Sequence, residues 1–94
     1  MIITVQDFKD FAKIDNEEED NIVEQMILEA QAAAEDYCGQ SFEDYAPLPV
    51  VQACKMYALY SYENRDNPDA TSYRGMMLAW QRLLYPHRTA ATMI

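Results

Sequence analysis

The spacing of apolar residues along the chain predicts a series of helices joined by polar segments. Thr4, followed three residues later by Asp7, is typical of a helix N-cap with an acidic partner and predicts a short helix over residues 5–13. Apolar residues then recur three and four positions apart over residues 18–38, which predicts a long amphipathic helix. Gly39 follows it, as expected of the residue that ends a helix in the left-handed conformation.

Two further helices are expected in the second half. Residues 49–63 are apolar on nearly every side, relieved chiefly by Gln52 and Lys55, so this helix must be covered all round. An amphipathic stripe over residues 75–85 predicts a short last helix that Pro86 ends. In so short a chain the other helices can shield about two faces of the apolar helix, which leaves one face for another subunit.

The segments between these stretches lack a sustained period. Residues 40–48 read as a connecting loop, residues 66–75 as a mobile polar loop and residues 89–94 as a flexible tail. Gly is nearly absent, which disfavours a turn-rich β architecture. The prediction is a single all-α domain over residues 1–94, a small bundle of about four helices.

The composition bears on partners and on compartment. The chain has 11 aromatic residues and six methionines, more than a small core easily hides, which suggests either a partner subunit that covers some of them or the ordinary exposure of a small domain. Cys38 and Cys54 lack metal or redox spacing and are predicted to be reduced, buried small hydrophobes of an intracellular protein. The start of the chain resembles no signal peptide, and no apolar run is long enough for a membrane span, so a soluble protein is expected.

Charge is divided unevenly along the chain. Residues 1–46 hold 13 carboxylates against two lysines, a net charge of −11, whereas residues 47–94 hold five cations against three carboxylates, a net charge of +2. A protein with an acidic half and a weakly basic half can attract copies of itself in a fixed orientation and repels polyanions. The charge distribution therefore favours assembly over nucleic-acid capture.

The residue types needed for common catalytic and metal sites are scarce. His87 is the one histidine, which disfavours a histidine metal site or a catalytic triad. An EF-hand loop counted from Asp15 would place Asp20 where glycine is needed and Met26 where a bidentate glutamate is needed. Phosphate-binding and nucleophile motifs are absent from the sequence, and its arginines are dispersed. We therefore predict a non-enzyme with no catalytic, cofactor-binding or metal-binding residues.

Several short motifs, in their order and spacing, resemble the gp6-like head-tail connector family (DNA-packaging adaptors) of long-tailed bacteriophages and prophages. They are VQDFKDFAKID (5–15), YCG (37–39), LP (48–49), YENR (62–65) and LLYPHR (83–88). The resemblance implies an all-helical structural protein that forms a homo-oligomeric ring beneath the portal protein, extends the DNA channel and docks the next tail-completion protein. It also implies a location in the virion, at the head-tail junction, after assembly in the host cytoplasm. The segment over residues 66–73 is more polar than is usual in this family.

The resemblance and the apolar pattern together give two sets of candidate site residues. The candidates for packing against another subunit or the portal, which could equally be ordinary core residues, are Val50, Val51, Tyr57, Tyr60, Tyr62, Arg65, Met77 and Trp80. Arg65 could pair with a neighbouring subunit, with Asp69 or with a helix-end carbonyl. The candidates for lining a channel through which DNA passes without specific binding, or alternatively for a solvated helix start, are Glu17, Glu18, Glu19 and Asp20.

Two other classes of function remain open at this point. The acidity alone would permit a DNA mimic that blocks a nucleic-acid-binding enzyme, or another helical protein interaction module. An enzyme or a metal-dependent regulator is the third class. A free connector subunit could be a monomer until it docks.

Overall fold

The fold is built from four α-helices, as predicted. The computed structural model describes residues 1–43, 45–65 and 70–89, and of residues 70 and 71 only the backbone. The elements are α1 (Val5–Ala12), α2 (Asp20–Cys38), α3 (Leu48–Glu63), α4 (Ala70–Leu84) and a short 3-10 helix, η1 (Tyr85–His87). Every regular element in the described ranges is helical, which confirms the all-α class.

The local signals at the helix ends act as predicted. Thr4 Oγ1 accepts a hydrogen bond from the Asp7 backbone N–H, and the Asp7 carboxylate accepts one from the Thr4 N–H, so the capping box is complete. Gly39 ends α2 with a φ of 71°, a left-handed conformation that costs a residue without Cβ little. Lys13 takes the equivalent position after α1, with a φ of 60°.

The prediction of a loop over residues 66–75 is wrong for its second part. Helix α4 begins at Ala70, five residues before the predicted start of the last helix at residue 75. The polar residues of this first turn carry no apolar period, but Tyr73 packs on Tyr60 of α3, with ring centroids 5.7 Å apart. This tertiary contact supports a helical turn that the local pattern does not predict. Residues 66–69, the rest of that segment, lie outside the described residues.

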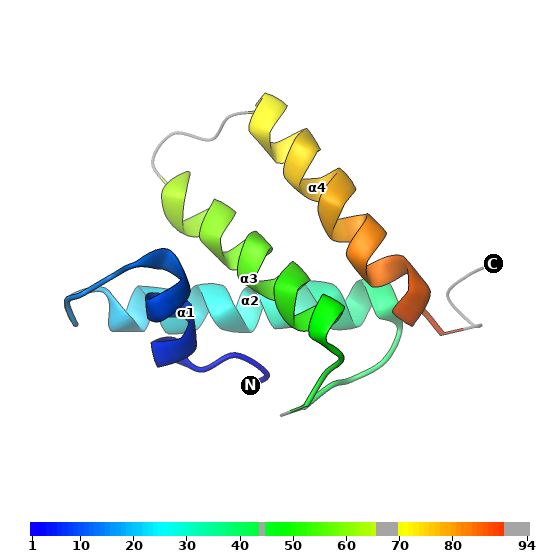
Figure 1. Cartoon of the computed structure of the whole chain (residues 1–94), viewed down its shortest axis with the longest axis horizontal. Helices are drawn as coiled ribbons and strands as arrows, with labels where there is room; N and C mark the ends of the chain where they lie inside the picture. Colours follow the sequence, from blue (N-terminus) through cyan, green and yellow to red (C-terminus); the bar gives the residue numbers. More distant parts are fainter. Residues whose placement is uncertain (44, 66–69, 90–94) are drawn as a thin grey trace.

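Helix α3 is central to the packing. Figure 1 shows α3 and α4 side by side above the long α2, with α1 against the N-terminal half of α2. On its side toward α2, α3 buries Val50, Ala53, Cys54 and Ala58 completely. Their small side chains let the two helix backbones approach closely, and buried residues of α2 such as Ala30 and Ala34 face the same core.

The molecule is flattened, with principal extents of 42 × 31 × 17 Å. A thin arrangement of helices cannot enclose all of its apolar side chains, and nine large apolar residues remain exposed among those that the structure describes. The most exposed is Tyr45, at 81%, followed by Leu48 at 68%. The flat shape therefore leaves apolar surface on several elements, and this surface is relevant to function.

Candidate protein interaction surface

A groove runs along the side of α3 that is turned away from α2. Helix α3 forms its floor, Phe11 of α1 and Leu83 of α4 contribute its walls, and its volume is about 660 Å³. The α3 residues that line it are Leu48, Gln52, Lys55, Met56, Leu59, Tyr60 and Glu63. The groove is the side of the apolar helix that the rest of the chain leaves uncovered, as the sequence led us to expect.

The charged groups of the groove lie on α3 itself. Lys55 places its ammonium nitrogen 5.6 Å from the centre of the exposed Phe11 ring, within the range of a cation–π contact. Glu63 is at the last turn of α3. A largely apolar lining with a few polar groups is typical of a surface that binds a protein or small-molecule partner.

The predicted interface residues are dispersed. Val50 is fully buried against the core, and Trp80 is 4% exposed and packs on the rings of Tyr37 and Tyr57. Of the eight residues, Tyr60 lines the groove. The half-buried members that pack against the core are Val51, Tyr57, Tyr62 and Met77. An interface role for this set stays a prediction, and Val50 and Trp80 have the least surface available for it.

Arg65 has partners within its own chain. Its guanidinium lies 2.8 Å from a carboxylate oxygen of Glu19, donates to the backbone carbonyl of Tyr62 and stacks over the Tyr62 ring at 4.5 Å. The helix-end carbonyl was one of the partners considered from the sequence, whereas Glu19 was not. The Tyr62 hydroxyl also donates to Glu19, and this hydrogen bond, followed by burial, raises the pKa of Tyr62 above its ordinary value of 10.

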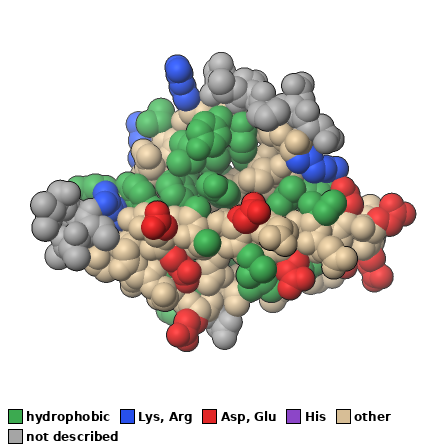
Figure 2. All heavy atoms as spheres, turned by 180° about the vertical axis from the view of Figure 1, so that it is seen from behind, with side chains coloured by type: hydrophobic (Ala, Val, Ile, Leu, Met, Phe, Trp, Pro, Cys, Tyr) green, Lys and Arg blue, Asp and Glu red, His purple; other side chains and the backbone are tan. Residues whose placement is uncertain are grey.

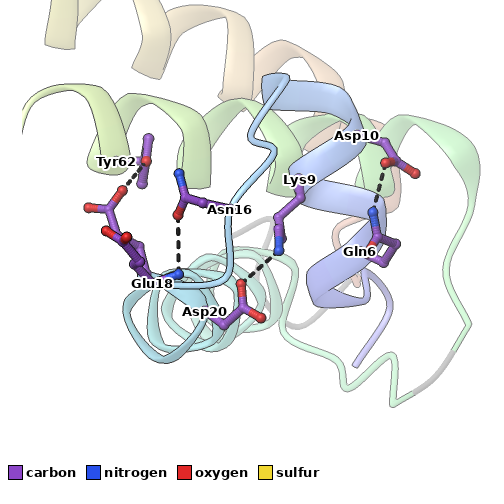
Figure 3. Close-up of polar contacts among 8 residues, drawn as sticks. Gln6, Lys9, Asp10, Asn16, Glu18, Asp20 and Tyr62 are labelled. Atoms are coloured by element: carbon purple, nitrogen blue, oxygen red, sulfur yellow. Dashed lines mark hydrogen bonds and ion pairs between the residues drawn. The ribbon is translucent and has the colours of Figure 1, made fainter.

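The four carboxylates of residues 17–20 therefore fall into two groups, one with and one without an ion pair within the described residues. Figure 3 shows Tyr62 directed at this segment and Lys9 directed at Asp20. Lys9 is 6% exposed and its ammonium nitrogen lies 2.9 Å from the Asp20 carboxylate, which satisfies a nearly buried charge. Glu17 and Glu18 are exposed. Glu19 and Asp20 are each held in an ion pair, whereas no ion pair within the described residues involves Glu17 or Glu18.

Charged and apolar side chains are also segregated on the back of the molecule. Figure 2 shows an apolar area with acidic side chains below it and Lys and Arg side chains at its edges. Helix α2 has five carboxylates and no cation, whereas α4 has two arginines and no carboxylate. The halves that differ in charge along the sequence thus form separate helices in space.

Both cysteines are buried thiols, as predicted. Burial raises the pKa of the Cys54 thiol to about 12, and the thiol contacts the Ala30 carbonyl oxygen at 3.8 Å. Burial also raises the pKa of Cys38. Protonated, enclosed thiols are poor nucleophiles and poor metal ligands, so these residues serve packing. Among the described residues no group of three or more histidine, cysteine or carboxylate side chains is placed to hold a metal ion.

Sequence reasoning missed most of the exposed apolar residues. Leu48 and Phe11 belong to the groove, and Leu28 and Leu78 are exposed on α2 and α4. The available signal was a leucine outside the apolar stripe of its helix, because such a residue cannot contribute to the core on that side. Within the described residues, no helix combines the length and apolarity needed to cross a membrane.

Comparison with known proteins agrees with this description. The chain matches the family described as phage gp6-like head-tail connector protein over residues 2–88 of its 94 residues. Neither the curated proteins nor the solved structures contain a match. The matched segment includes all four α-helices and the 3-10 helix, and so the whole groove. The chain therefore belongs to the phage gp6-like head-tail connector family, whose members are structural proteins of the virion.

Proposed function

We propose that this protein is a head-tail adaptor that forms a ring beneath the portal, extends the DNA channel and docks the next tail-completion protein. Membership of the connector family over residues 2–88 is the observation that carries this proposal. The role is structural and not catalytic, in keeping with the family. Its partners would be further copies of itself, the portal protein and a tail-completion protein, assembled in the host cytoplasm and kept in the virion.

The shape of the subunit supports assembly. A flattened domain with an open groove and exposed residues such as Tyr45 and Leu48 carries apolar surface that a neighbour can cover. Ring subunits use two different surfaces, one toward each neighbour, and so need apolar area on more than one side. The exposed large apolar residues that the structure describes lie on each of the four α-helices, on the 3-10 helix and in the segments before α1 and α3.

The acidity supports passage of DNA without capture. A duplex carries about one negative charge per 1.7 Å, so an acidic wall repels the backbone that a basic wall would bind. Glu17 and Glu18 are the candidates for such a wall, because Glu19 and Asp20 have partners within the chain. The double variant Glu17→Gln/Glu18→Gln tests this without breaking either ion pair. Unchanged DNA retention and ejection in particles assembled with it would remove the channel role.

The ring is tested by mixing the protein with portal particles. Light scattering of the protein alone gives its free state, and negative-stain imaging of the mixture is expected to show an added ring of density on the portal. A small acidic helical protein from another source serves as the control for non-specific adhesion. A protein that stays a monomer and adds no density to portal particles would contradict the proposal.

A further inference from the structure

Helices α2 and α4 each carry an exposed leucine on the side opposite their buried residues. Leu28 is 47% exposed and Leu78 is 56% exposed. Residues two apart in a helix lie about 200° apart around its axis, so Leu28 is opposite the buried Ala30 and Leu78 opposite the buried Trp80. Ala30 contacts Cys54 of α3 and Trp80 packs on Tyr57 of α3, so each leucine lies on the side of its helix turned away from these contacts.

The flank around Leu78 is basic. Arg74 lies one turn before Leu78 and Arg82 one turn after it, and both arginines are exposed. Neither guanidinium forms an ion pair with the described residues, since the ion pairs there join Lys9 to Asp20 and Arg65 to Glu19. We call Arg74, Leu78 and Arg82 the basic face.

The flank around Leu28 has the same form with the opposite charge. Glu24 lies one turn before Leu28, Ala32 one turn after it, and Glu29 and Asp36 lie beside this row, all of them exposed. The small Ala32 lets another helix approach closely. We call Glu24, Leu28, Glu29, Ala32 and Asp36 the acidic face.

The two faces also agree in length. At 1.5 Å per residue, Arg74 and Arg82 are about 12 Å apart along α4, and Glu24 and Asp36 are about 18 Å apart along α2. Both arginines therefore fit within the length of the acidic face. The two faces belong to different helices, and among the described residues no ion pair joins one face to the other.

We propose that the acidic face of one copy docks onto the basic face of the next, with Leu28 and Leu78 meeting at the centre. This rests on the proposed function, since it supplies the contact between neighbours in the ring. The two surfaces differ and belong to different helices, so each copy binds one neighbour through each surface, and the contact repeats around a ring. Opposite charges around an apolar centre would fix the orientation of the neighbours and would weaken with added salt.

Charge reversal tests the contact. The basic-face variant Arg74→Glu/Arg82→Glu places carboxylates against carboxylates and is expected to weaken subunit association about tenfold or more, measured by ring density on portal particles. Adding Glu24→Arg/Glu29→Arg swaps both faces, restores attraction and returns the net charge to its original value. Association is expected to recover in this swapped variant. Lys13→Glu changes an exposed lysine away from both faces and is the control for charge alone.

The outcomes separate this inference from the proposed function. If the unaltered protein adds no ring to portal particles, the proposed function fails. If it does, and the basic-face variant assembles equally well or the swapped variant does not recover, the contact proposed here is overturned. A swapped variant that does not recover would indicate that the basic face binds a different partner.

A cross-linking experiment covers the case in which a charge variant fails to fold. Leu28→Cys and Leu78→Cys copies are mixed with portal particles and oxidised, while the buried Cys38 and Cys54 stay protected. The proposed contact predicts mixed Leu28→Cys to Leu78→Cys cross-links. Cross-links between two Leu28→Cys copies or between two Leu78→Cys copies, or none at all in a formed ring, would refute it.

Discussion

The contact between α2 and α3 and the N-terminal 20 residues are held in place by different means. Where α2 meets α3 the side chains are small and apolar, with Ala30, Ala53 and Ala58 fully buried. In the N-terminal region, buried Ile3 and Phe8 are accompanied by a capping box and two ion pairs that involve Lys9 and Glu19. The α2–α3 contact is therefore held by apolar side chains that exclude water. The N-terminal region is held partly by hydrogen bonds and ion pairs.

The two kinds of contact therefore contribute differently to the stability of the fold and to the placement of its N-terminal residues. A closely packed apolar contact loses several kcal/mol when a charge enters it, whereas a half-exposed ion pair contributes about 1 kcal/mol or less. We therefore expect the α2–α3 contact to supply most of the stability. The polar contacts of the N-terminal region fix where α1 and the acidic segment lie.

The thiol in the α2–α3 contact gives the largest expected effect. Cys54 is fully buried with a pKa of about 12, so it is protonated and enclosed at neutral pH. Its labelling by a thiol reagent is expected to be at least about a thousandfold slower in the native protein than in denaturant, because reaction requires opening. A cysteine introduced at the exposed Gln52 is the control and should label rapidly. Fast native labelling of Cys54 would show that this contact is loose.

A carboxylate placed in the same contact comes next. Ala53→Asp buries an unpaired charge and is expected to lower the free energy of unfolding by about 3 kcal/mol or more, measured by urea denaturation. The neighbouring Gln52 is exposed, so Gln52→Asp introduces the same side chain on the same helix at little cost. Equal effects of the two substitutions would contradict the packing described here.

The ion pair of the N-terminal region predicts a smaller loss in the free energy of unfolding. Glu19→Gln removes the charge that pairs with Arg65 and weakens the acceptor of the Tyr62 hydroxyl, which is expected to cost about 1 kcal/mol. For a domain of this size that is a fall in melting temperature of about 4–8 °C. Glu18→Gln, one residue away and exposed, should change little. A loss as large as that of Ala53→Asp would reverse the comparison.

The helix cap gives the smallest effect and a pH dependence. Thr4→Ala is expected to cost about 1 kcal/mol or less, while Thr4→Ser keeps the acceptor and should be nearly neutral. Hydrogen bonds from Thr4, chiefly its backbone N–H, lower the pKa of Asp7 below 3.8. A lowered folded-state pKa contributes stability above pH 3.8 that is lost as pH falls through the lower value. Asp7→Asn should reduce this acid sensitivity in urea denaturation at about pH 3 and about pH 7.

The helices could be predicted from the sequence because their signals are local. The Thr4 cap, the period of residues 18–38 and the left-handed Gly39 each depend on neighbours a few positions away. The start of α4 could not be predicted, since its first turn is supported by Tyr60, which lies 13 positions before Tyr73. Contacts between distant positions leave no period in the sequence.

The surfaces were harder to predict than the helices. A helix that is apolar on every side gives no indication of which side the chain itself covers, so Val50 and Tyr60 looked alike although one is core and the other lines the groove. The pairing of Glu19 with Arg65 joins residues 46 positions apart. The uneven charge along the chain could be recognised in the sequence. Its division between the acidic α2 and the basic α4 could be recognised only in the structure.

Both ends of the described chain are attached to α2. The Ile2 N–H donates to the Gln31 side chain at 2.9 Å, and the Thr89 N–H donates to the Cys38 carbonyl at 2.9 Å. Gln31 and Cys38 are about 10 Å apart along the helix. A dense marker attached at residue 2 and another at residue 89 would therefore appear as two fixed reference points on one rod. Their order in images that resolve about 10 Å would give the direction in which α2 runs in each copy of a particle.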